Sequence, residues 1–208
     1  LVGGGTLGEE DSLLASVGRV VDDVRDRLRD RQHKDGHWLF ELEADTTIPS
    51  EYILLEHFLD EIDEDIERKL GVYLREQQAD HGGWPLFYGG EFNISASVKA
   101  YYALKLKGDS PDAPHMLRAR DAILAHGGAA ASNVFTRITL ALFDQLPWRA
   151  VPVMPIEIML LPRWFPFHLS KVSYWSRTVI APLLILMALK PRARNPRGVH
   201  IDELFVTP

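Results

Sequence analysis

A short motif that occurs twice places the strongest constraint on how this chain can fold. Glutamine, glycine and tryptophan recur with identical spacing, 46 residues apart, as Gln32, Gly36 and Trp38 and again as Gln78, Gly82 and Trp84. A glutamine amide in the last turn of a helix can hydrogen-bond the next turn, glycine permits a tight reversal, and tryptophan can fold back over the helix end. We therefore predict a structural repeat in which each copy clamps one helix to the next.

Apolar residues recur every three or four positions along most of the chain, which is typical of amphipathic helices. Helices are predicted over residues 11–32, 50–59, 63–78, 95–106, 113–126, 132–146 and 173–189, with Ser50 as the N-cap of the second. The strand signal is poor throughout, and short turns rich in glycine and proline separate the helices. This pattern predicts an all-α fold of antiparallel helix pairs.

The composition excludes several kinds of protein. With 46% hydrophobic and 25% charged residues among 208, the chain has enough apolar material for a sizeable core, which excludes wholesale disorder. The chain contains no cysteine, which excludes disulfides, thiolate nucleophiles and cysteine-rich zinc sites and favours a cytosolic compartment. Catalysis would have to use carboxylates, histidines, hydroxyls or aromatic faces.

Charge is distributed unevenly along the chain. Residues 1–144 carry 26 acidic and 15 basic side chains, whereas residues 145–208 carry 3 acidic and 8 basic ones. The acidic first part argues against a nucleic-acid partner, and the basic, apolar second part suits an anionic membrane surface. Candidate membrane contacts are residues 160–167, within a proline-interrupted apolar connector that is either buried or membrane-facing, and the basic stretch 192–197.

Two further features concern targeting and membrane spans. Residues 1–8 lack the basic end and apolar run of a signal peptide, and residues 1–10 are expected to form a flexible, glycine-rich leader. The apolar run 178–189 contains Pro182 and is shorter than the roughly 20 residues that a membrane span needs, so a core helix is predicted there. Because the chain begins with Leu1, we expect it to be trimmed or a fragment.

One string of residues matches a known metal-binding pattern. Asp22, Asp23 and Asp26 match an Asp-Asp-x-x-Asp string that binds magnesium and diphosphate in one class of enzyme. Arginines crowd the same stretch and no second ligand cluster follows, so a solvated, charged helix face is the better interpretation. The eight histidines show no paired metal spacing. We predict no metal site and no cofactor.

Several blocks of sequence resemble one family, the squalene–hopene cyclases among the triterpene cyclases. The second glutamine–tryptophan motif is similar to the repeat of that family, including the stretch Lys69-Leu70-Gly71-Val72-Tyr73-Leu74 before it, although the family usually has glycine or alanine where Leu70 stands. Four more blocks are similar in residues and order to the amino-terminal part of the bacterial enzymes: Val134-Phe135-Thr136-Arg137, Pro147-Trp148, Pro155-Ile156-Glu157-Ile158-Met159 and Trp175-Ser176-Arg177-Thr178. The resemblance covers nearly the whole chain from Gln32 to Leu204.

The resemblance implies an α/α-barrel (toroid) fold, incomplete in this chain. Residues 11–190 would form the amino-terminal, γ-type domain, and residues 191–208 a basic, irregular tail leading towards a catalytic domain. The resemblance implies an isomerase of hopanoid biosynthesis that cyclises squalene to hopene or hopanol. In that family the reaction is a carbocation cascade, and an acid in an Asp-x-Asp-Asp motif starts it by protonating the substrate. That string is absent here, so the chain alone is expected to be inactive and to contain no catalytic acid.

The resemblance also implies site residues and partners. Phe135 and Trp175 would line the substrate cavity, and Glu51 would belong to its water network, although Pro49, Ser50 and Lys99 depart from the family pattern. The implied partners are squalene, the carboxy-terminal catalytic domain, the membrane surface and a second subunit in a homodimer. The implied location is peripheral, or monotopic, on the cytoplasmic side of the membrane, with no transmembrane span.

Other interpretations remain open at this point. Phe135 and Trp175 could be ordinary core aromatics, and Glu51 a solvated carboxylate at a helix start. The chain could also be a non-catalytic helical-repeat module that binds a lipid or a protein on its concave face. The arrangement of the two rings would discriminate, because a cavity wall has both rings pointing into a shared apolar pocket whereas a core holds them in closed packing.

Overall fold

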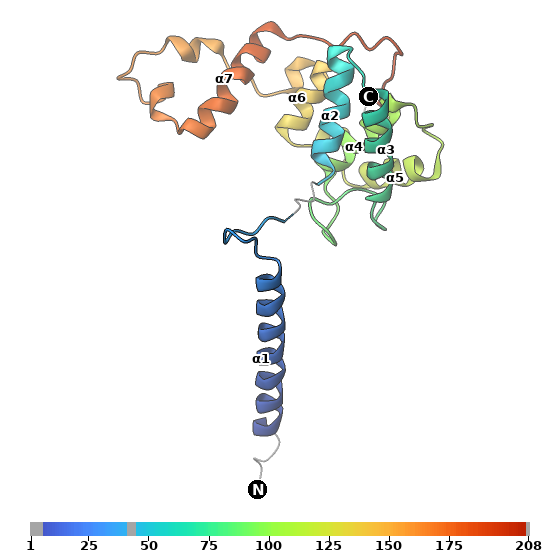
Figure 1. Cartoon of the computed structure of the whole chain (residues 1–208). Helices are drawn as coiled ribbons and strands as arrows, with labels where there is room; N and C mark the ends of the chain where they lie inside the picture. The colour runs from blue at the N-terminus through green and yellow to red at the C-terminus, as the bar shows by residue number, and fades with distance from the viewer. Residues whose placement is uncertain (1–5, 41–44, 207–208) are drawn as a thin grey trace. The chain divides into compact units, whose positions relative to one another are not determined.

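The computed structural model describes residues 6–40 and 45–206, and it divides the chain into two compact units, Leu1–Glu43 and Ala44–Pro208. The division falls inside the single domain of residues 11–190 that the sequence predicts. Within the described ranges all regular structure is α-helix or short 3₁₀ helix, as Figure 1 shows. The all-α prediction is confirmed. No helix in these ranges combines the length and the apolar character that crossing a bilayer requires.

The first unit contains one long helix, α1 (Thr6–Asp30). It begins before residue 11, the predicted start, and the first five residues of the predicted leader lie outside the described residues. Seven large apolar side chains at helical spacing are exposed on α1: Leu13, Leu14, Val17, Val20, Val21, Val24 and Leu28. Ion pairs at helical spacing, such as Arg25 to Asp22 at 2.7 Å, occupy its charged side.

Over residues 45–206 the second unit contains six α-helices: α2 (Thr47–Leu59), α3 (Glu64–Glu76), α4 (Ile94–Lys107), α5 (Pro114–Ala125), α6 (Val134–Leu142) and α7 (Tyr174–Leu189). Side chains that accept backbone hydrogen bonds begin four of them, from Asp63, Asn93, Asn133 and Ser173. The predicted N-cap at Ser50 is wrong. Helix α2 begins earlier, and the Ser50 hydroxyl instead donates to the Thr46 carbonyl at 2.5 Å within the helix.

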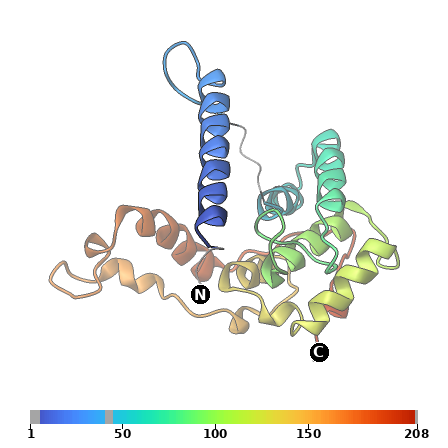
Figure 2. The same cartoon turned by 90° about the horizontal axis from the view of Figure 1, so that it is seen from below.

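Helix α4 forms the centre of the second unit. Eleven of its residues are buried, and it packs against α2, α3, α5 and α6, as Figures 1 and 2 show from two directions. Neighbours surround most of this helix, which is why small and apolar residues occur on most of its sides and its polar residues form no single face. The side chains that fill the core without exposure include Ile53, Leu74, Trp84, Tyr101, Met116 and Ile123.

The first motif copy closes the end of α1 through two side-chain hydrogen bonds. The Gln32 amide donates to the Gly36 carbonyl at 2.7 Å, and the Trp38 indole donates to the Leu28 carbonyl in the last turn of the helix, also at 2.7 Å. Gly36 has a φ of 91°, in the left-handed region that favours glycine. The indole is thus a second donor to the Leu28 carbonyl, which also accepts from the Arg31 backbone at 3.2 Å.

The second copy makes the same two bonds at the end of α3. The Gln78 amide donates to the Gly82 carbonyl at 2.7 Å, and the Trp84 indole donates to the Leu74 carbonyl at 2.7 Å. Gly82 has a φ of 86°. A Cβ at this position would also lie 2.8 Å from the Arg118 carbonyl oxygen, so space as well as conformation requires glycine.

The two copies differ in what surrounds them within their own units. Gln78 also donates to the His115 carbonyl at 2.8 Å and accepts from Arg118 at 2.6 Å, which ties α3 to α5. Trp84 is completely buried, whereas Trp38 is 46% exposed. The second copy therefore clamps one helix to another, and the first copy closes the turn after its own helix.

The segment 191–206 returns to the core of the second unit. The sequence predicts an irregular tail here, and the backbone is irregular apart from one short 3₁₀ helix, η5 (Asp202–Leu204). However, Ile201 and Leu204 are completely buried, and η5 packs against α5. The segment is thus part of the fold, a feature that its basic composition did not indicate.

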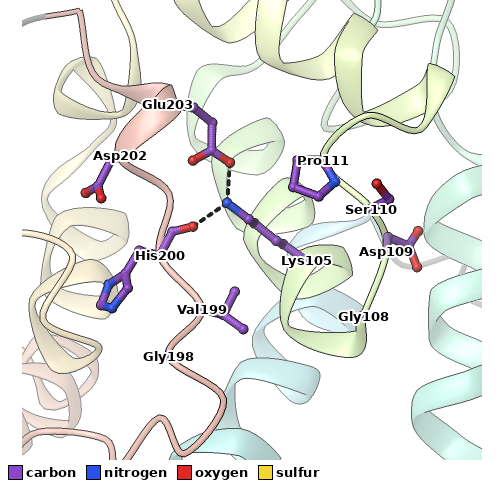
Figure 3. A pocket seen from close by; sticks show the side chains of 10 residues that line it. All are labelled: Lys105, Gly108, Asp109, Ser110, Pro111, Gly198, Val199, His200, Asp202 and Glu203. Atoms are coloured by element: carbon purple, nitrogen blue, oxygen red, sulfur yellow. Dashed lines mark hydrogen bonds and ion pairs between the residues drawn. The ribbon is translucent and has the colours of Figure 1, made fainter.

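Polar contacts hold this returning segment against α4. The Lys105 ammonium contacts the Glu203 carboxylate and the His200 carbonyl, at the edge of a polar pocket of about 540 Å³ that Figure 3 shows. The Tyr101 hydroxyl donates to the same Glu203 carboxylate at 2.8 Å. Burial on its own would raise the pKa of Glu203, but the bonds from Lys105 and Tyr101 outweigh it and hold that pKa below its usual value.

The lowered pKa of Glu203 predicts an acid-dependent loss of stability. A carboxyl whose pKa is lower in the folded state stabilises the fold at neutral pH, and this stabilisation is lost as the pH falls through the folded value. Glu203→Gln should lower the melting temperature at pH 7, and the difference from the parent should shrink between about pH 5 and pH 3. Asp121→Asn, at an exposed carboxylate, is the control. A Glu203→Gln difference that is unchanged at pH 3 would contradict the assignment.

Candidate cavity wall

Helix α2 leaves a stripe of apolar side chains uncovered. Ile48, Tyr52, Leu55 and Leu59 follow one another at spacings of three and four residues and therefore lie on one face of the helix. All four are exposed, although other residues of the same helix, including Ile53 and Leu54, are buried against α4. We call these four residues the α2 stripe. It gives the second unit an apolar surface that its own described elements do not cover.

Glu51 lies on the same face as the α2 stripe, three residues after Ile48 and four before Leu55. Its carboxylate accepts a hydrogen bond from the Lys99 ammonium on α4 at 2.6 Å. The Glu51 side chain is 51% exposed and the Lys99 side chain only 7%. Glu51 is therefore more than a solvated carboxylate, because it is the charge partner of a buried lysine.

Lys99 was expected only to depart from the family pattern, and its pairing with Glu51 was not predicted. A signal was present, since Lys99 stands among small and apolar residues in the buried middle of α4, between Val98 and Ala100. A lysine is rarely buried without a charge partner. The identity of that partner could not be read from the sequence, because Glu51 lies 48 residues away.

Phe135 is the second residue of α6 and is 56% exposed. The start of this helix is fixed in two ways. The Asn133 side chain caps it by accepting from Thr136, and the Asn133 backbone donates to the Ser95 hydroxyl of α4 at 2.9 Å. Ser95 lies one helical turn before Lys99, so the start of α6 lies against the side of α4 that carries Lys99.

Trp175 is the second residue of α7 and is 78% exposed. Helix α7 joins α6 through a small apolar cluster that includes Ile138, Ala141 and Met187. Phe135 and Trp175 make no ring contact with each other in the described structure. Both side chains are uncovered in the described structure, so neither is packed in the core of the second unit.

The connector between α6 and α7 is also largely uncovered. It contains three short 3₁₀ helices, η2 (Trp148–Ala150), η3 (Ile156–Leu160) and η4 (Leu169–Lys171), and in Figure 1 it lies with α7 on the side of α6 away from α3 and α5. Its exposed large apolar residues are Val153, Ile156, Met159, Leu160, Trp164 and Phe167. The predicted core helix over 178–189 needs correction, because α7 buries only Leu184 and Met187.

The aspartates of α1 are engaged by arginines of the same helix. Arg25 contacts Asp22 at 2.7 Å and Asp26 at 3.1 Å, and Arg27 contacts Asp23 at 2.9 Å. Carboxylates that are neutralised by guanidinium groups are poor ligands for magnesium. The structure thus supports the interpretation of a charged, solvated helix face.

These features together define a class of protein. It is an all-α, toroid-type domain whose helix pair is clamped by a glutamine–tryptophan turn and whose uncovered apolar surface carries aromatic rings. A family model described as the squalene-hopene cyclase N-terminal domain matches residues 21–208. The chain belongs to this family.

Individual relatives support the same family. The chain is 62% identical over 188 residues to the squalene–hopene cyclase of Zymomonas mobilis subsp. mobilis, a match that covers 90% of this chain and 29% of the relative. It is 65% identical over 176 residues to that of Bradyrhizobium diazoefficiens, covering 84% and 27%. For the enzyme of Alicyclobacillus acidocaldarius subsp. acidocaldarius the identity is 35% over 189 residues, covering 91% and 30%. The chain therefore spans less than a third of the length of these relatives.

Proposed function

We propose that this chain is the amino-terminal part of a class II triterpene cyclase that converts squalene to hopene or hopanol. In this proposal residues 11–190 form the γ-type domain, the segment that follows leads towards the catalytic domain, and that domain supplies the Asp-x-Asp-Asp acid. The chain itself supplies cavity wall. Phe135, Trp175 and Glu51 are the wall residues, and neither a metal nor a cofactor is required for protonating an alkene.

The uncovered apolar and aromatic surface is the observation that carries this proposal. A polyene cyclisation passes through carbocations, which need a wall that excludes water and holds no nucleophile within bonding reach of the cation. Aromatic faces stabilise such cations by about 0.5–2 kcal/mol each through their quadrupoles. Phe135 and Trp175 are exposed in the second unit and are thus free to present their faces to a substrate. A closed binding module would have buried them.

A chimera tests the proposal directly. This chain replaces the segment that it matches in the Zymomonas mobilis relative, and the product is incubated with squalene in detergent. We expect cyclic triterpene from the chimera and from the unmodified relative, and none from this chain alone. A chimera that folds with the melting temperature of the relative but forms no cyclic product would refute the proposal and favour a non-catalytic binding module.

The proposal includes peripheral, monotopic attachment to the cytoplasmic side of a membrane. Exposed Leu160, Trp164 and Phe167 lie beside the basic residues Arg163 and Lys171, a combination that suits the interface of an anionic bilayer. The stretch 192–197 is less suited. Its arginines are engaged within the fold, with Asp144 at 3.3 Å, Asp60 at 3.1 Å and the Leu106 carbonyl at 3.2 Å. A homodimer stays a prediction of the family resemblance.

Vesicle binding tests the membrane contact. The chimera should sediment with vesicles that contain anionic lipid, and a Trp164→Ser, Phe167→Ser variant should sediment less because it has lost two interfacial aromatic anchors. Arg192→Gln in the predicted basic stretch serves as the control and should bind like the parent. Equal sedimentation of the parent and the double variant would exclude residues 160–167 as the contact.

A further inference from the structure

The ion pair between Lys99 and Glu51 is asymmetric in its burial. The Lys99 side chain is 7% exposed and the Glu51 side chain 51%, and the ammonium nitrogen lies 2.6 Å from a carboxylate oxygen. The cation is thus inside the second unit and the anion is at its surface, on the face of α2 that carries the α2 stripe. A solvent-exposed pair would place both charges in water.

The position of Lys99 makes this asymmetry a fixed property of the fold. Helix α4 is buried over most of its length and α2 packs along it, so the lysine cannot turn outwards without disrupting the core. Removing one partner of a buried pair leaves an uncompensated charge, which is strongly destabilising. Lys99 therefore requires an anion at the position that Glu51 occupies, and Glu51 in turn is held at one place on an otherwise apolar surface.

We propose that Lys99 is a positioning residue that fixes both the place and the negative charge of the Glu51 carboxylate on the cavity wall. The inference rests on the proposed function, for which it names a further determinant. The ammonium remains behind the helix surface, and the carboxylate is the charge presented towards a carbocation. Preorganised charge of this kind stabilises a cation because no reorganisation is needed when the positive charge develops.

The absence of Lys99 would change the wall in a predictable way. A carboxylate that is not held by Lys99 is free to adopt other rotamers, and Coulomb attraction falls with distance. The wall then loses negative charge at one fixed point, so the cascade should be intercepted earlier and yield products with fewer rings.

Three variants of the chimera test this role. Lys99→Arg keeps a cation of longer reach and should retain the product pattern, with a rate within about threefold of the parent. Lys99→Met should lower the rate of complete cyclisation by about tenfold, which corresponds to about 1.4 kcal/mol of transition-state stabilisation, and should raise the share of incompletely cyclised products. Lys99→Glu combined with Glu51→Lys keeps an ion pair but places the ammonium at the surface.

The exchanged variant, Lys99→Glu with Glu51→Lys, distinguishes a role of Lys99 in positioning the Glu51 carboxylate from a role in stability alone. It should melt near the parent, since a pair is retained, but it should lose most complete cyclisation because a positive charge now faces the carbocation. Lys105→Met removes the other α4 lysine that pairs with a carboxylate, Glu203, away from the wall. That control should lower the melting temperature without changing the product pattern.

The outcomes are distinguishable from one another. If the exchanged pair keeps the rate and product pattern of the parent, or if Lys99→Met changes stability alone, the positioning role is wrong while the cyclase function stands. If the parent chimera folds but forms no cyclic product, the proposed function itself fails. Should Lys99→Met not fold, Lys99→Met with Glu51→Gln removes both charges, and the same rise in incompletely cyclised products is expected; an unchanged pattern there would overturn the proposal.

Discussion

Replacing Trp84 with alanine is expected to lower the free energy of unfolding of the second unit by about 3–5 kcal/mol. The side chain is completely buried, so the substitution opens a large cavity in the core between α3 and α4. It also removes the indole N–H that satisfies the Leu74 carbonyl at 2.7 Å, which leaves a polar group unpaired at a helix end. Urea unfolding followed by far-ultraviolet circular dichroism measures the change.

The matched control for this substitution is Trp164→Ala in the same unit. Trp164 is 77% exposed, and surface substitutions of this kind usually change stability by about 0.5 kcal/mol or less. The two variants, Trp84→Ala and Trp164→Ala, remove the same kind of side chain from a buried and from an exposed position. Comparable losses of stability in the two variants would mean that Trp84 does not hold the helix end.

The second large effect is expected on activity instead of stability. In the chimera, Trp175→Leu and Phe135→Ala should each lower the rate of cyclic triterpene formation by about tenfold to thirtyfold, since each removes an aromatic face that stabilises a carbocation. Both side chains are exposed in the second unit, so the melting temperature of this chain alone should hardly change. Gas chromatography of the extracted products measures the rate.

A solvent-exposed ring outside the wall provides the comparison for these variants. Tyr88, in the loop between α3 and α4, is 96% exposed, and Tyr88→Ala should leave the rate unchanged. A rate for Trp175→Leu that equals the parent would exclude Trp175 from the wall. Trp175→Phe should keep most of the rate that Trp175→Leu loses, because phenylalanine retains an aromatic face without the indole N–H.

The glutamine–tryptophan turns were predictable because their contacts are local. Each indole reaches a carbonyl ten residues earlier, and each amide reaches a carbonyl four residues later. The hydrogen bonds of such a motif join residues close together in the chain, so the spacing between its glutamine, glycine and tryptophan was sufficient to indicate a clamp. The burial of the clamp was not predictable. Trp84 is covered because α4 and α5 pack around it, whereas no described element of the first unit covers Trp38 to the same extent.

The candidate site was predictable in its residues but not in its geometry. The family resemblance indicated Phe135, Trp175 and Glu51, and the structure shows the rings uncovered and the carboxylate paired. The pairing of Glu51 with Lys99 and the return of the segment around Glu203 to Tyr101 join positions 48 and 102 residues apart. Contacts at such separations depend on how the helices pack, and periodicity within one helix contains no information about them.

The sequence by itself therefore determined the helices, the turns that close them and the family to which the chain belongs, since these follow from local hydrogen bonding and from strings of matching residues. Only the tertiary structure decided which apolar residues are covered and which charges meet. Burial is a property of neighbours that are distant in the chain. The same apolar periodicity marks the buried side of α2 and the α2 stripe, and only packing against α4 tells them apart.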